Sequence, residues 1–254
     1  MKQFLLLWGL LYFLSGAHAT PTKVTIRVKA KDAKFIGTAI GGAAVVIRDN
    51  RTGALLASGI TTGTSGDTKS ILQTSYQRYQ SITDDKTAGF VANIDIDAPT
   101  FVDIEVVAPV SRRGSAIKGS TQIWVIPGKD ILGDGIILEL PGLILDILNP
   151  TTHQIISSDS IKNNSLPVRI SLTMLCGCPI SKGGVWNAND FEVKAVLKKE
   201  GSPIGTFTLQ KAVQTNIFEG NLPVKEKGNY QVVVYAFQSR SNNSGVDLLN
   251  FVIQ

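Results

Sequence analysis

Residues 41–62 read GGAAVVIRDNRTGALLASGITT, and this stretch has the pattern of two β-strands joined by a tight turn. Two apolar runs flank DNRTG at residues 49–53, a group of residue types that favour turns. Gly53 can adopt the positive φ that such a turn requires without steric cost. The stretch therefore predicts a β-hairpin over residues 42–61.

Alternating apolar and polar residues recur on both sides of this hairpin. TKVTIRVKAK at residues 22–31 points Val24, Ile26 and Val28 to one face, which is typical of a half-buried strand. Part of residues 69–79 is compatible with a short helix. Similar patterns predict further strands over residues 90–96, 101–107, 121–126, 136–140, 143–148, 168–175, 191–197, 206–209, 218–222, 230–237 and 246–252.

The hairpin resembles the opening of carboxypeptidase-regulatory-like and transthyretin-like modules, which share a G-A-x-V…T-G-x-x-(apolar)-A-x-G-x-T pattern. That resemblance implies an immunoglobulin-like sandwich and no particular activity. The chain departs from the pattern at residues 63–86, a polar tract with Tyr76 and Tyr79. Near the other end, Gly228-Asn229-Tyr230 leads into an alternating strand and resembles the tyrosine corner of immunoglobulin-like sandwiches.

These patterns predict an all-β chain of two tandem antiparallel β-sandwich domains, both immunoglobulin-like. Pro141-Gly142 interrupts two apolar strands, and we place the domain boundary there. The first domain then covers residues 20–142, and the second covers residues 143–254 and carries both cysteines of the chain.

The first 19 residues have the layout of a secretory signal peptide. Lys2 provides the positive charge, FLLLWGLLYFL at residues 4–14 is the apolar region, and Ala17-His18-Ala19 has the Ala-x-Ala cleavage pattern. An apolar region of about 11 residues is too short to span a bilayer. We therefore expect a secreted protein, periplasmic or extracellular, with no transmembrane segment in the mature chain.

Composition and motifs narrow the range of functions. An apolar content of 43% supports packed cores, and a net charge of +5 without a basic cluster does not predict a nucleic-acid partner. The sequence contains no G-x-S-x-G or Walker A motif, and His153 is the only histidine outside the signal peptide. We therefore predict a protein that is not an enzyme and needs no cofactor.

One stretch is chemically unusual, LPVRISLTMLCGCPISKGGVW at residues 166–186. An extended strand advances roughly 6.6 Å over two residues, whereas the Cα atoms of a relaxed disulfide lie about 5.5–6 Å apart. A bridge between Cys176 and Cys178 therefore needs a bend, which Gly177 permits and Pro179 can fix. We predict this disulfide as a local clip, in a bridge that is exposed.

Other readings of the cysteine pair stay open. A strained, exposed bridge suits a redox-active disulfide. If the strand continues, Met174, Cys176 and Cys178 project to one face, and two thiolates with a thioether suit Cu(I). The two thiols are also compatible with burial as small apolar groups. The copper reading makes these three residues candidate metal ligands.

Aromatic residues offer a further hypothesis. Trp124 and Trp186 are candidate platforms for a ligand, as is the Tyr76/Tyr79 pair, in a non-catalytic carbohydrate-binding module. For Trp186 a place in the core is the competing interpretation. Asp103 and Glu105 share one face of a predicted strand, which we interpret as the wet face of a one-sided sheet.

The sequence thus favours an exported, non-enzymatic binding or structural protein of the cell envelope or extracellular space. Its expected partner is another envelope or extracellular protein, with carbohydrate as an alternative. The rival hypothesis is a redox or Cu(I)-handling accessory protein that uses Cys176 and Cys178.

Overall fold

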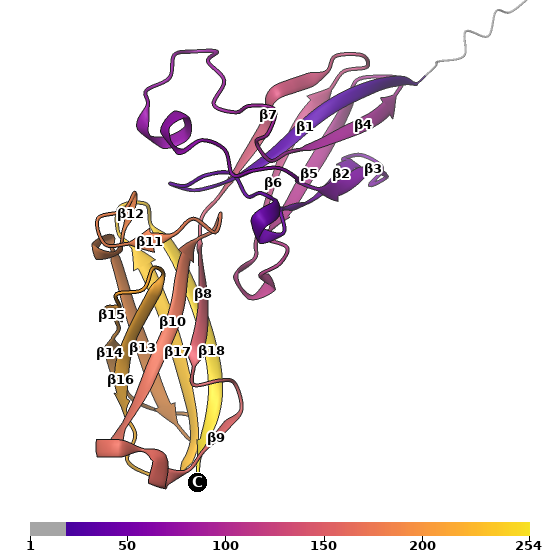
Figure 1. Cartoon of the computed structure of the whole chain (residues 1–254). Helices are drawn as coiled ribbons and strands as arrows, with labels where there is room; N and C mark the ends of the chain where they lie inside the picture. The colour runs from indigo at the N-terminus through magenta and orange to yellow at the C-terminus, as the bar shows by residue number, and fades with distance from the viewer. Residues whose placement is uncertain (1–18) are drawn as a thin grey trace, which may run out of the picture.

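The structure is a computed structural model that describes residues 19–254. The basic and apolar regions of the predicted signal peptide lie outside these residues. The described chain forms two β-sandwiches placed end to end, with Thr20 and Gln254 at the far ends (Figure 1). No helix within residues 19–254 is long and apolar enough to cross a membrane.

The first sandwich packs a three-stranded sheet, β4-β1-β7, against a four-stranded sheet, β3-β2-β5-β6. The predicted hairpin is confirmed, because β2 and β3 pair antiparallel across the turn that ends at Gly53, where φ is 73°. The strands of the first sandwich are β1 (Thr20–Ala30), β2 (Ala44–Asp49), β3 (Leu55–Ile60), β4 (Phe90–Ile96), β5 (Thr100–Ala108), β6 (Ile117–Val125) and β7 (Ile131–Leu140).

One feature of this sandwich differs from the sequence pattern. Residues 130–135 read DILGDG, which has the composition of a turn, but from Ile131 on they belong to β7, which pairs parallel with β1. Gly133 and Gly135 have φ values of 67° and 64°, and the pairing register shifts there, so the glycines form an irregular start to the strand. These glycines interrupt the alternation of apolar and polar residues, so the sequence pattern does not indicate the start of this strand.

The polar tract after β3 is held on the sheet by a buried arginine. Arg27 of β1 donates to the carbonyls of Thr87, Ala88 and Gly133, and burial lowers the pKa of its guanidinium.

The short helix expected within residues 69–79 is one π-type turn. The helical turns are η1 (Thr38–Ile40), η2 (Lys69–Gln73), η3 (Arg113–Ser115), η4 (Ser158–Ser160), η5 (Lys162–Asn164) and η6 (Ala188–Asp190).

The second sandwich packs the sheet β15-β16-β10-β8 against the sheet β14-β13-β17-β18-β9, with β11-β12 as a small pair. Its strands are β8 (Leu143–Asn149), β9 (Gln154–Ile156), β10 (Ser165–Met174), β11 (Ile180–Ser181), β12 (Trp186–Asn187), β13 (Phe191–Lys199), β14 (Ser202–Thr208), β15 (Gln210–Lys211), β16 (Ile217–Pro223), β17 (Gly228–Gln238) and β18 (Asn243–Ile253).

The tyrosine corner is confirmed. The buried Tyr230 at the start of β17 donates its hydroxyl to the carbonyl of Glu226, four residues upstream, at 2.7 Å. Its ring stacks on Phe251 with centroids 5.3 Å apart. Parallel pairing of β9 with the last strand completes the sheet. The chain therefore consists of two tandem immunoglobulin-like β-sandwiches, antiparallel apart from a few parallel pairs.

Candidate functional site

The cysteine segment is a tight turn at the end of β10. The strand stops at Met174, and the amide of Gly177 donates to the Met174 carbonyl at 2.7 Å. Gly177 has a φ of 76°, which provides the bend that the sequence requires. Cys176 and Cys178 lie at disulfide-bonding distance with Cα atoms 5.4 Å apart. Because the chain turns at Met174, the continuous strand assumed for a shared Met-Cys-Cys face is wrong.

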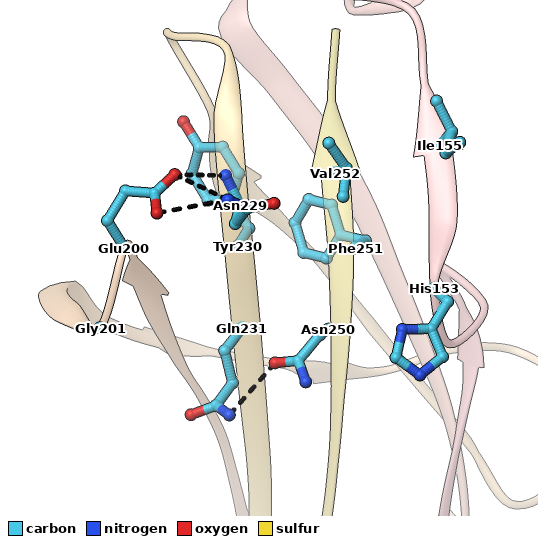
Figure 2. Close-up of a pocket in the computed structure, with 10 residues that line it drawn as sticks. All are labelled: His153, Ile155, Glu200, Gly201, Asn229, Tyr230, Gln231, Asn250, Phe251 and Val252. Atoms are coloured by element: carbon cyan, nitrogen blue, oxygen red, sulfur yellow. Dashed lines mark hydrogen bonds between the residues drawn. The ribbon is translucent and has the colours of Figure 1, made fainter.

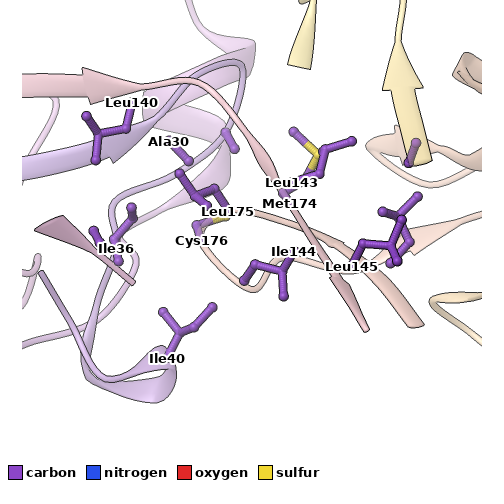
Figure 3. Close-up of a cluster of buried hydrophobic side chains, with 14 of the residues drawn as sticks. Ala30, Ile36, Ile40, Leu140, Leu143, Ile144, Leu145, Met174, Leu175 and Cys176 are labelled. Atoms are coloured by element: carbon purple, nitrogen blue, oxygen red, sulfur yellow. The ribbon is translucent and has the colours of Figure 1, made fainter. Parts of the chain in front are cut away.

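This turn lies between the two sandwiches and not on an open surface. Only 6% of Cys176 and 5% of Cys178 is exposed, so the expectation of an exposed bridge is wrong. A Cβ added at Gly177 would meet the side chain of Ile40 at 3.1 Å, which places the turn against the first sandwich. Figure 3 shows Cys176 among apolar side chains from both sandwiches, including Ile36 and Leu143.

Buried polar side chains reinforce this junction. Asn243 is fully buried, donates to the carbonyl of Lys31 at 3.0 Å and accepts from the amide of Gly142 at 2.9 Å. Gln238 donates to the carboxylate of Asp32 at 3.0 Å. These bonds join the β17–β18 turn of the second sandwich to the turn after β1 and to the segment between β7 and β8. The sandwiches are therefore coupled by oriented bonds as well as by apolar contact.

Trp186 belongs to the same junction. Its side chain is 6% exposed, and its indole Nε1 donates to the carbonyl of Asp32 at 2.8 Å. A ligand platform needs an open ring face, so the burial of Trp186 contradicts that role and agrees with the competing core interpretation. A buried indole N–H needs a hydrogen-bond acceptor, and this requirement is the signal that could have indicated the contact. The acceptor here is the Asp32 carbonyl of the other sandwich.

The candidate copper ligands Met174, Cys176 and Cys178 lie near one another in the chain turn, but none of them is accessible as a free ligand. Met174 is completely buried, and the two cysteine sulfurs are paired with each other. Thiolates are the form that binds soft metals, so a site here requires prior reduction of the bridge. Across residues 19–254 no group of three or more His, Cys, Asp or Glu side chains is placed to hold a metal ion.

Trp124 has the opposite environment. It lies on the outward face of β6, is 59% exposed, and packs against Phe101 of β5 with ring centroids 5.1 Å apart. The next cross-strand pair on this face is Asp103 and Gln122. Gln122 donates to the Asp103 carboxylate at 2.6 Å, and Asn50 donates to the same carboxylate at 3.0 Å. An open aromatic ring therefore borders a cluster of ordered polar groups.

A hollow of about 510 Å³ opens beside these residues. It lies across the middle of the β2, β5 and β6 strands, and its polar lining includes Arg48, Asp103, Glu105 and Gln122. Glu105 forms an ion pair with Lys118 at 2.5 Å. The solvent-facing sheet face predicted for Asp103 and Glu105 therefore contains a hollow whose lining combines acidic, basic and amide side chains.

A second hollow, of about 490 Å³, lies at the far end of the second sandwich and includes His153 (Figure 2). Its amides are already paired, since Asn229 donates to Glu200, and Gln231 donates to Asn250 at 3.2 Å. Hydrogen bonds from Asn229 hold the pKa of Glu200 below its usual value. No serine, threonine or cysteine is among the residues that line this hollow with His153.

The Tyr76/Tyr79 pair lies in the polar tract of the first sandwich, which bonds to Asp134 of β7, whereas Trp124 lies on β6 of the other sheet. Both side chains are exposed, and the guanidinium of Arg78 lies over the Tyr79 ring at 4.5 Å from its centroid. The structure therefore does not combine the tyrosines and Trp124 into one platform.

Comparison with known proteins finds no matching family model and no matching curated protein. Among solved structures, fibronectin(III)-like modules of Clostridium thermocellum CbhA match over 92% of this chain and 94% of theirs, with 13% identity and a TM-score of 0.28. Titin domains Z1Z2 in complex with telethonin match over 92% and 95%, with 8% identity and a TM-score of 0.25. An engineered protein matches over 48% of this chain and 22% of its own, with 12% identity and a TM-score of 0.33.

Proposed function

We propose that this chain is an exported, non-enzymatic binding protein that docks another envelope or extracellular protein on its second sandwich. The docking surface is the outer face of the sheet β14-β13-β17-β18-β9. The signal-peptide pattern of residues 1–19 supports export, and the sheet face supports binding.

One observation carries this proposal: apolar side chains cluster on the solvent side of that sheet. Val233 pairs with Leu248, and Tyr235 pairs with Val246, so these four side chains point to one face. The opposite face of the same strands forms the core. We call the outward cluster the apolar face, and its members are Val196, Val233, Tyr235, Phe237, Val246 and Leu248.

The apolar face has the composition of an interface centre. Single exposed apolar residues are normal, whereas contiguous apolar patches with a polar rim mark interaction sites. Lys194 and Glu192 form an ion pair at 3.1 Å at the border, and the hydrogen bond that Lys194 donates to Glu192 raises the pKa of Lys194. The hydrogen bonds at the junction also support this role, because they fix the orientation of the apolar face relative to the first sandwich.

Site-specific photo-crosslinking in the source cells tests the proposal. A photoreactive residue replaces Val246, which is 52% exposed on the apolar face. Val91 is the matched control, because it is a 50% exposed valine on β4 of the other sandwich. We expect one dominant protein crosslinked through position 246 and absent at position 91. Equal crosslinking at both positions, or crosslinks only between copies of this chain, contradicts the proposal.

The rival function is redox or Cu(I) handling by Cys176 and Cys178. Both cysteines are buried and Gly177 between them lies against Ile40, which favours a structural clip, since thiol exchange requires access to the sulfur atoms. Intact mass after alkylation, with and without mild reduction and Cu(I), separates the two functions. A bridge that opens to glutathione in the folded protein, or thiols that copper protects from alkylation, supports the rival.

A further inference from the structure

The outer face of β2, β5 and β6 presents a tryptophan that the fold does not need. The Trp124 side chain is 59% exposed and contacts Phe101 on the same face, while the core of this sandwich lies on the other face of the sheet. Neither ring belongs to the buried core, so removing Trp124 leaves that core intact. An exposed large aromatic side chain with one open face offers a stacking surface.

Polar groups are held in order one step along the strands from this ring. Asp103 accepts hydrogen bonds from Asn50 and Gln122, so the carboxylate is fixed in place while it keeps acceptor positions toward solvent. Arg48 lies opposite Asp103 in the register of β2 and β5, and its guanidinium donates to the carbonyl of Gly53 at 3.2 Å and has further N–H donors. A row of donors and acceptors therefore runs across the sheet beside the aromatic pair.

The charges on this face balance. Arg48 and Lys118 face Asp103 and Glu105, and the Lys118–Glu105 pair is already joined at 2.5 Å. A face selecting for an ion carries an excess of the opposite charge. Here the balance favours a neutral ligand rich in hydroxyl groups, which can both donate and accept.

We propose that this face binds neutral carbohydrate, as a chain of pyranose rings. The C–H face of one sugar stacks on Trp124, and the hydroxyl groups of the next bond to Asp103, Gln122 and Arg48 in the hollow of about 510 Å³. Consecutive outward residues on a strand are roughly 7 Å apart, so a sugar ring on Trp124 brings its own hydroxyl groups or those of the next sugar within reach of Gln122 and Asp103. The face is separate from the apolar face of the second sandwich, so each proposal stands or fails alone.

Retention on insoluble polysaccharides tests this proposal with the full chain. The probes are cellulose, chitin, xylan and starch, followed by titration with soluble oligosaccharides of whichever is retained. Trp124→Ala and Asp103→Ala are each expected to weaken binding at least about tenfold, as loss of an aromatic or polar anchor does. Trp124→Phe should restore part of the affinity, because it keeps a ring.

Tyr79→Ala is the matched control, because Tyr79 is an exposed aromatic residue outside this face. A thermal melt of each variant shows whether the fold is kept. A second readout is quenching by acrylamide: bound oligosaccharide should protect Trp124, while the buried Trp186 gives the same signal with and without sugar. Failure of all four polysaccharides to retain the protein, or retention that Trp124→Ala leaves unchanged, overturns the proposal.

Discussion

Trp186 and Trp124 both lie among amide and carboxylate side chains, yet their surroundings are organised in opposite ways. The indole of Trp186 and the amides near it bond to the backbone of the other sandwich. The amides beside Trp124 bond to a side chain on their own sheet, Asp103, and leave the ring open. The first region uses its polar groups to join two bodies, and the second holds them available to solvent.

The difference shows what burial does to the same residue types. A buried amide that loses its partner costs about 1–3 kcal/mol, whereas an exposed amide exchanges its partner for water. Substitutions at the junction should therefore change stability, and substitutions on the Trp124 face should change binding.

The largest effect is expected at Asn243. Asn243→Ala leaves the amide of Gly142 and the carbonyl of Lys31 without partners inside the junction. The free energy of unfolding should fall by about 2–4 kcal/mol in chemical denaturation. Asn250→Ala, on the exposed side of the same strand, is the control and should change it by less than about 0.5 kcal/mol. Equal effects of the two variants would show that the junction network contributes nothing special.

The two tryptophans provide the next test. Trp186→Phe keeps a ring but removes the N–H that donates to Asp32, and should cost about 1–2 kcal/mol. Trp124→Phe should leave stability within about 0.5 kcal/mol, because the side chain is largely exposed. Urea titration of both variants checks the contrast, which a destabilised Trp124→Phe variant would contradict.

A smaller effect is expected from the cysteine pair. The bridge closes a very short loop, so replacing both cysteines by alanine should cost only about 1 kcal/mol. Small-angle scattering should show unchanged dimensions, because the bonds of Asn243 and Trp186 remain. An elongated or flexible variant would instead make the bridge the main lock of the junction.

The smallest effect concerns acid and the first sandwich. Burial would raise the pKa of Asp134, but bonds from Ser81, Thr83 and the amide of Ile82 outweigh it and lower the pKa. The stabilisation is therefore complete above the ordinary pKa of aspartate and is lost as the pH falls through the lowered value. In the wild type, hydrogen exchange of the amides at residues 82–83 should accelerate as the pH falls through the lowered pKa of Asp134. In Asp134→Asn, exchange at these amides should follow only the intrinsic pH dependence of amide exchange.

Local pattern was sufficient for most of the fold. The β2–β3 hairpin, the alternating strands and the Tyr230 corner each depend on a few neighbouring residues, so they could be read directly. The irregular start of β7 could not, because two glycines break the alternation and its partner β1 is about 110 residues earlier in the chain.

The candidate site was predictable only as chemistry. The bend at Gly177 follows from the spacing of two cysteines, but the burial of that turn depends on Ile40 in the other sandwich. Trp124 and Trp186 likewise differ in exposure because of distant packing, which no local sequence signal reports. Contacts between the two sandwiches, and between strands far apart in the chain, were the information missing from the sequence.

The parallel pairing of β1 with β7 has a mechanical consequence. Tension between Thr20 and Gln254 pulls β1 from its start and β7 from its end, so their hydrogen bonds are sheared together and not opened one after another. The second sandwich repeats this geometry, since β9 runs parallel with β18, which leads to the other end of the chain. Stretched from its ends, the molecule would resist as two shear-loaded units in series.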